Sequence, residues 1–439
     1  CQPSDDLQFL ITNFSNAMAF NKTFVRKLYK VFKALFMDSI TARKDNFFFE
    51  LSPQMFCLLD IFVTLYYNFL LITDSEDFIN QNHFTLAEVK DISYTILKLS
   101  VNLNWNLDII KEHKVKIYFA VQSAKLMKLI QEYNLNLHFL DTKQASIDKN
   151  WVKQLRHDIS GGHNQLRVLY LKRLPFTIPF ESRLAIFQDH LRVEKEINLA
   201  ITKITIRRSN LFEDGWIAFS KLGNNYLRGK LQVTFVDEFG QFEEGIDAGG
   251  LFKEFLIELS KIIFNPGYGL FKITENEQGL YPNPESESYL GMEHLDIFYF
   301  VGLVVGRAIY DNILIESEFS QFFLRKILGK INYVNELQFL DKEMFNNLKF
   351  LKSYQGDVAD LFLTFSVTDC NNKEVELMPD GKQMAVTNQN KFKYIYAVAN
   401  HKLHTEIKNQ SKAFMSGLSV FVTSDWLQIF NEEELQIVI

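Results

Sequence analysis

Three cysteines are the residues of this chain best suited to nucleophilic chemistry, because a thiolate is a strong nucleophile and metal ligand. They are Cys1, Cys57 and Cys370. Cys57 lies in an apolar segment, and Cys370 follows Thr368 and Asp369 in a predicted turn. A cysteine hydrolase that pairs Cys57 or Cys370 with a histidine is the least favoured reading. Buried or exposed thiols without a catalytic role are favoured.

Metal chemistry has little support in the sequence. No CxxC pair has zinc-ligand spacing, and His157 and His163 lack an acidic or cysteine partner at metal spacing. We therefore predict no metal and no cofactor, and we expect both histidines on the surface. So few cysteines exclude a disulfide scaffold and indicate a reducing compartment, the cytoplasm or the nucleus.

Glycines and carboxylates gather in residues 235–255, FVDEFGQFEEGIDAGGLFKEF. A phosphate-cradling loop is excluded, since neither GxGxxG nor GxxxxGK[ST] occurs and carboxylates repel phosphate. Acidic residues before a helix complement its dipole. We predict that Gly249 and Gly250 are structural: they allow positive φ and close backbone approach just before a helix that begins at Leu251.

Length and charge narrow the class of protein. The 439 residues predict two to four compact units. Apolar residues make up 47% and charged residues 23%, which argues against disorder. The formal net charge is −6 and no basic stripe occurs, so we expect no nucleic-acid partner.

One segment, 55–72, is apolar over about the length of a bilayer span. Asp60 and Asn68 interrupt it, and no cationic flank sets an orientation. We predict a buried core helix and no membrane partner. Gly302-x-x-x-Gly306 is likewise interpreted as part of a tightly packed helix rather than as a membrane dimer motif.

The elements that must position these residues differ between the two parts of the chain. Residues 1–180 predict a mostly helical region, with Ser52-Pro53 and Thr85-Leu-Ala-Glu88 as helix starts. From residue 181 onward, alternating segments at 204–208 and 231–235 predict strands, with a helix over 210–226 between them. The predicted fold class is therefore α+β, dominated by helices.

The stretch VTFVDE.G....GIDAGGLFKEF resembles the N-terminal lobe of the HECT-type ubiquitin ligases. Further stretches continue the resemblance in the family's order across 183–439: Ile204-Thr-Ile-Arg-Arg208, Asn265-Pro-Gly-Tyr-Gly-Leu-Phe271, Tyr281-Pro-Asn-Pro284, Phe300-Val-Gly-Leu-Val-Val-Gly-Arg-Ala-Ile-Tyr310, Phe350-Leu-Lys-Ser-Tyr354, Leu363-Thr-Phe365, Val386-Thr-Asn388 and Glu434-Leu435. The likeness is greatest to the subgroup that extends ubiquitin chains, partly at the proteasome.

The resemblance implies a HECT N-lobe over 181–439, with a small inserted subdomain at about 336–395 that docks a ubiquitin-conjugating enzyme. The matching docking positions are Met344, Leu348, Tyr354, Leu363 and Tyr394. Met344 and Leu348 share a helix face, and tyrosines often anchor interfaces. The alternative is that the five form the subdomain's core. We expect Leu348 and Tyr394 to be partly exposed in a groove, whereas the other three are balanced between groove and core.

In the family a cysteine in a second, C-terminal lobe takes ubiquitin from the conjugating enzyme and passes it to a substrate lysine. The family's Thr-Cys motif occurs nowhere in this sequence, which ends where the hinge between the lobes is expected. The implied function is that of a ligase whose docking lobe lies here. Its partners would be a conjugating enzyme, ubiquitin, protein substrates and the proteasome. The alternative is a non-catalytic helical scaffold with a degenerate HECT-like surface.

Overall fold

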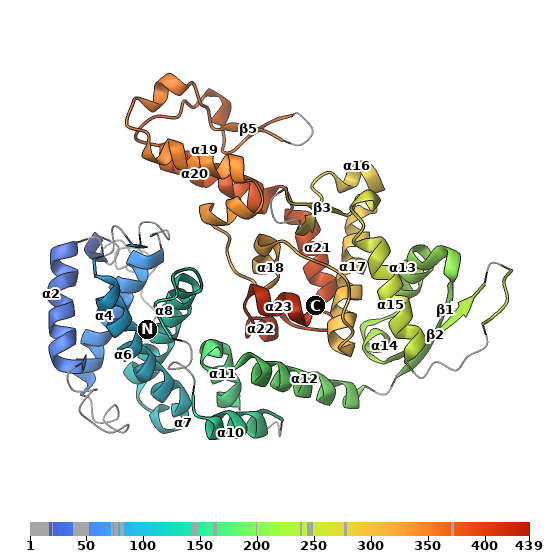
Figure 1. The fold of residues 1–439 in the computed structure, drawn as a ribbon, viewed down its shortest axis with the longest axis horizontal. Helices are drawn as coiled ribbons and strands as arrows, with labels where there is room; N and C mark the ends of the chain where they lie inside the picture. The colour runs from blue at the N-terminus through green and yellow to red at the C-terminus, as the bar shows by residue number, and fades with distance from the viewer. Residues whose placement is uncertain are drawn as a thin grey trace. The chain divides into compact units, whose positions relative to one another are not determined.

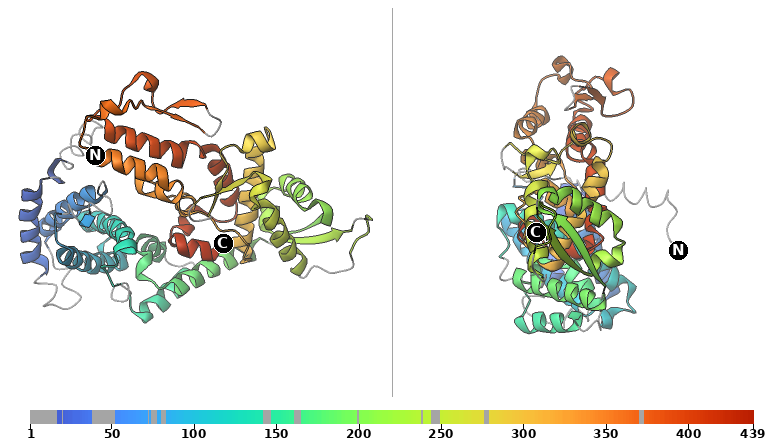
Figure 2. Two further views of the ribbon diagram at one scale, coloured as in Figure 1. Left: turned by 45° about the horizontal axis from the view of Figure 1, so that its top comes forward. Right: turned by 90° about the vertical axis from the view of Figure 1, so that its right-hand side faces the viewer.

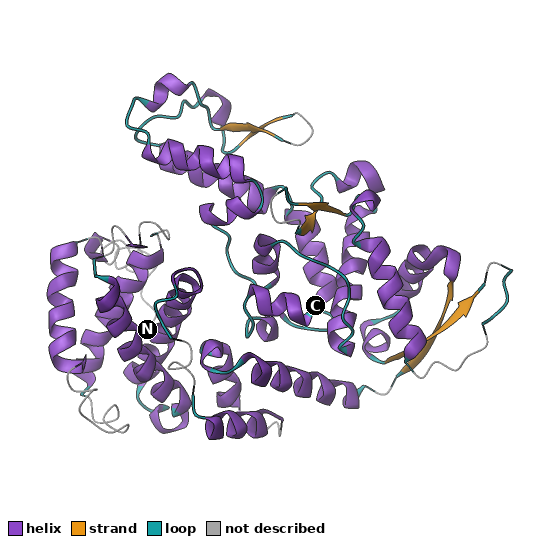
Figure 3. Cartoon of the chain, viewed as in Figure 1, coloured by secondary structure: helices purple, strands orange, loops and turns teal. Residues whose placement is uncertain are grey.

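The computed structural model describes residues 17–19, 21–37, 52–71, 73, 78–79, 83–141, 147–160, 165–198, 200–237, 239–243, 249–275, 279–369 and 373–439. The chain forms two compact units, Cys1–Ile186 and Phe187–Ile439. The division falls inside a helix, α12 (Phe180–Ile197), slightly beyond residue 180. Helices predominate in both units, and the few strands are short (Figure 3). The predicted helix-dominated α+β class is confirmed.

The regular secondary structure of unit 1 is entirely helical within its described residues (Figure 1). Its elements are α2 (Lys22–Phe32), the π-helix η1 (Lys33–Met37), α4 (Pro53–Leu71), α6 (Leu86–Trp105), α7 (Leu107–Ile110), α8 (Lys114–Leu137), α10 (Lys149–Ser160), α11 (Gln165–Arg173), the 3₁₀-helix η3 (Pro175–Thr177) and the start of α12.

Local capping signals begin two of these helices where the sequence predicted. The Ser52 hydroxyl accepts a hydrogen bond from the Met55 amide at 3.4 Å, and α4 starts at Pro53. Thr85 caps α6 in a complete capping box, since the Thr85 amide donates to the Glu88 carboxylate at 2.9 Å. Glu88 also binds Arg26 of α2, so the cap ties two helices together.

The apolar helix α4 is packed on one face. Phe56, Leu59, Phe62 and Tyr66 are buried, and Phe62 stacks on Phe32 of α2. Leu58, Ile61 and Leu71 are exposed. The predicted buried core helix is therefore buried on one face only. Among the described residues, α4 alone is long and apolar enough to cross a membrane by length and composition; a packed core helix meets the same criteria.

Unit 2 begins with the rest of α12 and combines helices with three strand pairs. Its first half contains β1 (Ile201–Arg207), η4 (Arg208–Asn210), α13 (Leu211–Lys221), α14 (Asn224–Arg228), β2 (Lys230–Val236), α15 (Gly250–Ile263), η5 (Pro266–Tyr268), β3 (Phe271–Ile273), β4 (Leu280–Pro282), α16 (Ser286–Leu290) and α17 (His294–Asp311).

The second half of unit 2 contains α18 (Gln321–Ile327), η6 (Val334–Phe339), α19 (Lys342–Ser353), η7 (Val358–Leu361), β5 (Ser366–Thr368), β6 (Glu374–Glu376), η8 (Gly381–Gln383), α20 (Lys391–Asn400), the π-helix η9 (His401–Thr405), α21 (Lys408–Leu418), α22 (Ser424–Leu427) and α23 (Glu432–Val438).

The two predicted strands of the lobe pair with each other in parallel, as β1 and β2, with Ile204 opposite Val233. The helix predicted over 210–226 is instead two helices, α13 and α14. Leu222 is extended at the end of α13, and Gly223 precedes α14 in an extended conformation. This break interrupts the backbone hydrogen bonds that a single helix would need.

A close crossing of α17 and α21 forms the centre of unit 2 (Figure 1). A Cβ on Gly302 would lie 2.0 Å from the Phe414 carbonyl oxygen, and one on Gly417 would lie 2.0 Å from the Tyr299 carbonyl oxygen. Gly306 similarly faces Leu418. The prediction that this glycine pair belongs to a tightly packed helix is confirmed, and α17 is buried along nearly its whole length.

The glycine-rich segment before α15 is only partly as predicted. Gly249 has a φ of +114°, and the helix begins at Gly250, one residue before the predicted start. A Cβ at either glycine would meet no atom of the described residues within 4 Å. With respect to the described part of the chain, the predicted close backbone approach is therefore wrong at both positions. Residues 244–248 lie outside the described residues.

Candidate docking surface of the small subdomain

The segment expected to dock a conjugating enzyme folds around two helices, α19 and α20, that lie side by side (Figures 1 and 2). Asp341 caps α19 by accepting a hydrogen bond from the Met344 amide at 2.8 Å. Asn388, just before α20, accepts one from the Val358 amide at 3.1 Å, which fixes η7 beside the start of α20. The antiparallel hairpin β5–β6 completes the subdomain.

Leu348 and Tyr394 lie in the core of this subdomain rather than in an open groove. Leu348 is 5% exposed and Tyr394 is 9% exposed, and both belong to one apolar cluster with Val398. The Tyr394 ring meets Phe365 edge-on at 5.5 Å, and burial raises the pKa of the Tyr394 phenol. The expectation that these two side chains are partly exposed is wrong, because α19 and α20 turn these faces toward each other.

The other three predicted docking residues lie at the rim of the same cluster. Met344, Tyr354 and Leu363 are each partly buried and pack against the cluster from its edge. The structure thus brings all five predicted residues together around one apolar cluster, and it leaves partly exposed the three that the sequence left undecided. Their role in binding a conjugating enzyme stays a prediction.

Sequence reasoning missed four exposed aromatic residues of the subdomain. Phe350, Phe362, Phe392 and Tyr396 are 60%, 90%, 58% and 55% exposed, respectively. Phe392 and Tyr396 are four residues apart on α20 and therefore share a face. Their spacing on a helix that also carries core residues was the available signal. A contiguous patch of exposed apolar side chains is typical of interaction sites.

Contacts link two of these aromatic residues, Phe350 and Phe392, to the predicted docking residue Tyr354. The Phe350 ring lies 5.5 Å from the Tyr354 ring, and the Lys391 ammonium donates to the Tyr354 carbonyl oxygen at 3.1 Å. The same ammonium lies 5.8 Å from the centre of the Phe392 ring. We call Phe350, Tyr354, Phe362, Phe392 and Tyr396 the aromatic surface.

Phe362 combines exposure with an unusual backbone conformation. Its φ is +52°, in the left-handed region that bulky side chains rarely adopt. A backbone held in this region costs on the order of 1 kcal/mol or more and commonly marks functional sites. Nothing in the sequence indicates this conformation, since no glycine or asparagine stands at position 362.

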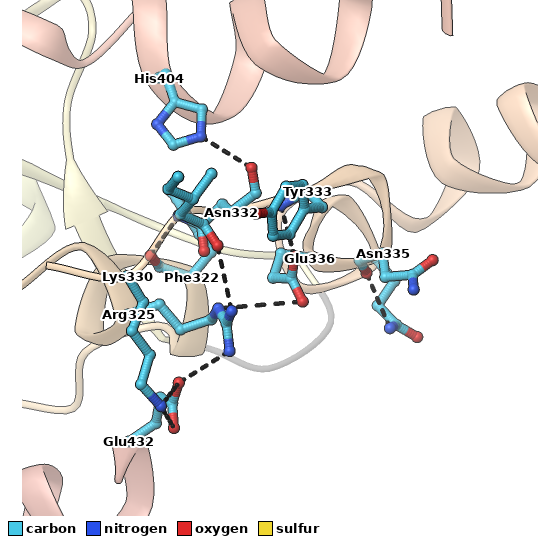
Figure 4. Close-up of polar contacts among 11 residues, drawn as sticks. Phe322, Arg325, Lys330, Asn332, Tyr333, Asn335, Glu336, His404 and Glu432 are labelled. Carbon is cyan, nitrogen blue, oxygen red and sulfur yellow. Dashed lines mark hydrogen bonds and ion pairs between the residues drawn. The ribbon is translucent and has the colours of Figure 1, made fainter. Parts of the chain in front are cut away.

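A polar network lies at the base of the subdomain (Figure 4). Arg325 of α18 donates to Glu432 of α23 at 3.0 Å and lies 4.0 Å from Glu336 of η6, while Lys330 binds Glu432 at 3.0 Å. Burial acts to raise the pKa of Glu432, but the charges of Lys330 and Arg325 outweigh it and hold that pKa below its usual value. The network joins the C-terminal helix to the subdomain's first turn.

The remaining candidate residues that the structure describes, Cys57 and His157, do not assemble into a second centre. Cys57 is an exposed thiol on α4, and Cys1 and Cys370 lie outside the described residues. His157 is exposed on α10, as predicted, whereas His163 also falls outside the described part. No group of three or more metal-ligating side chains occurs among the residues that the structure describes.

Comparison with known proteins shows where this architecture occurs. Residues 257–439 match the HECT domain, described as a ubiquitin-transferase. The chain is 33% identical over 421 residues to the E3 ubiquitin-protein ligase UPL6 of Arabidopsis thaliana, covering 88% of this chain and 40% of the relative. It is 32% identical over 412 residues to the Ubiquitin-protein ligase E3B of Homo sapiens, covering 88% and 38%.

The E3 ubiquitin-protein ligase HUL5 of Saccharomyces cerevisiae is 32% identical over 327 residues, which covers 68% of this chain and 35% of the relative. The chain thus spans about two fifths of the length of these relatives. A match over 88% of the chain reaches beyond the HECT domain into unit 1. On the HECT-domain match and these relatives, the chain belongs to the family of HECT-type ubiquitin ligases.

Proposed function

We propose that this chain supplies the conjugating-enzyme-docking part of a HECT-type ubiquitin–protein ligase. In that reaction a ligase cysteine thiolate attacks the thioester carbonyl carbon of ubiquitin, and the thiolate of the conjugating enzyme is released. A substrate lysine amine then attacks the new thioester, forms an amide bond to ubiquitin and releases the ligase thiolate. The observation that carries the proposal is the aromatic surface on the small subdomain, within the residues that match the HECT domain.

Docking is the contribution that these residues are suited to make. Aromatic side chains bury a large area and dominate interface energetics. Phe350, Phe362 and Phe392 are exposed in the same subdomain whose cluster has Met344, Tyr354 and Leu363 at its rim. The formal net charge of −6 gives the chain no overall positive charge that would attract nucleic acid.

Finer points of the proposal rest on the family resemblance. The segment from Phe350 to Tyr354 and the helical unit 1 suggest the chain-extending subgroup, with the proteasome as a partner of the ligase. Ubiquitin and substrate proteins are the other partners, and the small number of cysteines favours the cytoplasm or the nucleus.

Phe362 gives the sharpest test, because its side chain and its backbone conformation have opposite consequences. Glycine relieves the positive φ, so Phe362→Gly should leave the melting temperature unchanged or raise it. The same change should weaken binding of the cognate conjugating enzyme roughly thirtyfold, the loss of an anchor worth about 2 kcal/mol. Titration calorimetry and thermal melting of the same samples measure both effects.

Exposed aromatic residues of unit 2 outside the subdomain provide the control. Tyr289 is 65% exposed on α16, and Tyr289→Ala should leave binding unchanged. If Phe362→Gly binds the conjugating enzyme as tightly as the unaltered chain, the aromatic surface is not the docking site. If Phe362→Gly and Tyr289→Ala weaken binding equally, the interaction is nonspecific.

A further inference from the structure

A basic hollow of about 450 Å³ is lined by residues of α18, the end of α20, η9 and α21. Its cationic lining residues are Lys326, Lys408 and Lys412, and His404 and Ser411 line it as well. No lining residue carries a carboxylate, although acidic residues outnumber basic ones in the whole chain. Volumes of this order accommodate small molecules.

Helical spacing directs the α21 residues into this hollow. Lys408, Ser411, Lys412 and Met415 occupy positions i, i+3, i+4 and i+7 and therefore share one face of the helix. Lys408 and Ser411 lie in its first turn, where the helix dipole favours an anion, and the N-cap residue Ile407 supplies no side-chain cap. Lys408 and Lys412 are exposed and form no ion pair within the described part of the chain.

Ser411 gives an independent indication of a ligand. The residue is 2% exposed, and its hydroxyl group has no hydrogen-bond partner among the described residues. A buried hydroxyl without a hydrogen-bond partner destabilises the folded chain. An anion in the hollow would accept the hydrogen bond that the Ser411 O–H can donate.

Lys326 is held at the wall of the hollow by two neighbours. Its ammonium lies 3.3 Å from His404 Nδ1 and 3.4 Å from the Leu403 carbonyl oxygen. His404 Nε2 lies 2.9 Å from the Asn332 carbonyl oxygen (Figure 4), so it carries the hydrogen and Nδ1 accepts from Lys326. Two acceptors leave the ammonium one N–H for a ligand.

Burial lowers the pKa of the Lys326 ammonium to about 8, and it also lowers the pKa of His404. Both shifts reflect desolvation of a positive charge without a carboxylate to offset it. A bound anion would provide that missing counter-charge.

We propose that this hollow binds a small polyphosphate anion of the inositol-polyphosphate or pyrophosphate class. Three lysines from two helices match several phosphate groups better than a single carboxylate, because ammonium groups act as separate point charges. The anion would bridge α18 to α21. It would also contact η9, the π-helix that connects α20 of the small subdomain to α21.

Calorimetric titration of the 439-residue chain with inositol hexakisphosphate, pyrophosphate and inorganic phosphate, at one fixed ionic strength, tests this proposal. The two polyphosphates should bind at least about tenfold more tightly than inorganic phosphate. Lys408→Gln combined with Lys412→Gln should weaken polyphosphate binding roughly tenfold or more. Both lysines are exposed, so the double variant should fold normally.

Two further variants separate a site from general charge. Ser411→Ala should weaken binding roughly threefold while the free chain melts no earlier, because an unpartnered hydroxyl is removed. Lys221→Gln combined with Lys253→Gln changes the net charge equally at exposed positions elsewhere in unit 2 and should leave binding unchanged. Equal weakening by both double variants, equal affinity for inorganic phosphate, or no measurable binding would each overturn the proposal.

Discussion

Gly249 and Gly250 follow each other in the chain but have different backbone conformations. Gly249 has a φ of +114°, whereas Gly250 is the first residue of α15, and a Cβ on either would contact none of the described residues. Gly249→Ala should therefore lower the free energy of unfolding by about 1 kcal/mol through backbone strain alone. Gly250→Ala, its matched control, should be neutral or slightly stabilising. Urea unfolding of both variants measures the difference, and equal effects would refute the conformational explanation.

Burial decides the roles of Leu348 and Tyr394, both of which lie in the core of the small subdomain. Leu348→Ala should cost about 2–5 kcal/mol of stability because it leaves a cavity. Binding of the conjugating enzyme should be kept while the chain is folded. Met344→Ala at the rim should show the reverse, a small loss of stability with weaker binding. Thermal melting and binding titration on the same samples distinguish a core role from a docking role. A Leu348→Ala chain that melts normally yet fails to bind the conjugating enzyme would restore a direct docking role for Leu348.

At the scale of elements, α4 carries a carboxyl group in an apolar setting. Asp60 Oδ1 is buried without a hydrogen-bond partner among the described residues, and burial raises the pKa of Asp60 to about 6. The unfolded chain ionises this group near pH 4, so the native state binds more protons between these values. Stability therefore falls as pH rises from about 4 through about 6.

Asp60→Asn should remove this pH dependence. At pH 7.5 the variant should have a larger free energy of unfolding than the unaltered chain. This difference should exceed the difference at pH 4.5 by about 1 kcal/mol, once solvent screening is allowed for. Near-ultraviolet circular dichroism of the stacked Trp105 and Trp151 rings reports on unit 1 during urea unfolding. Asp108→Asn, at an exposed position of α7, is the control. A constant difference between Asp60→Asn and the unaltered chain at both pH values would contradict the assignment.

Elements with local signals could be predicted from the sequence, and those without could not. Ser52 and Thr85 are caps whose hydrogen bonds depend on residues three positions away, so their helices begin as predicted. The break between α13 and α14 was missed. Gly223 stands there, but a single glycine is also tolerated inside a helix, and no proline marks the break. The exposed face of α4 was missed because apolar composition shows no direction of packing.

For the whole molecule, the transfer step provides a direct test. With activating enzyme, conjugating enzyme, ubiquitin and ATP, these 439 residues should form no reductant-sensitive ubiquitin adduct, because they lack the family's Thr-Cys motif. Non-reducing gel electrophoresis detects such an adduct. Loss of an observed adduct in Cys57→Ala or Cys370→Ala would show that a cysteine of this chain accepts ubiquitin.

The family could be recognised from the sequence, whereas the exposure of individual site residues could not. Motifs in a fixed order survive changes in surface residues, so the order alone indicated the HECT N-lobe. Whether Leu348 or Phe362 faces solvent depends on how α19 and α20 meet and on one positive φ angle. Both are set by tertiary packing, which helical spacing does not encode.

The crossing of α17 and α21 has a consequence for how this domain tolerates mutation. A side chain that clashes with another side chain can be accommodated when the second one is shortened. Gly302 and Gly417 instead face main-chain carbonyl oxygens, of Phe414 and Tyr299, which every amino acid possesses. No second substitution can remove these oxygens. Suppressor screens starting from Gly302→Ala should therefore return reversion or general stabilisers elsewhere, and not compensating changes at positions 299 or 414.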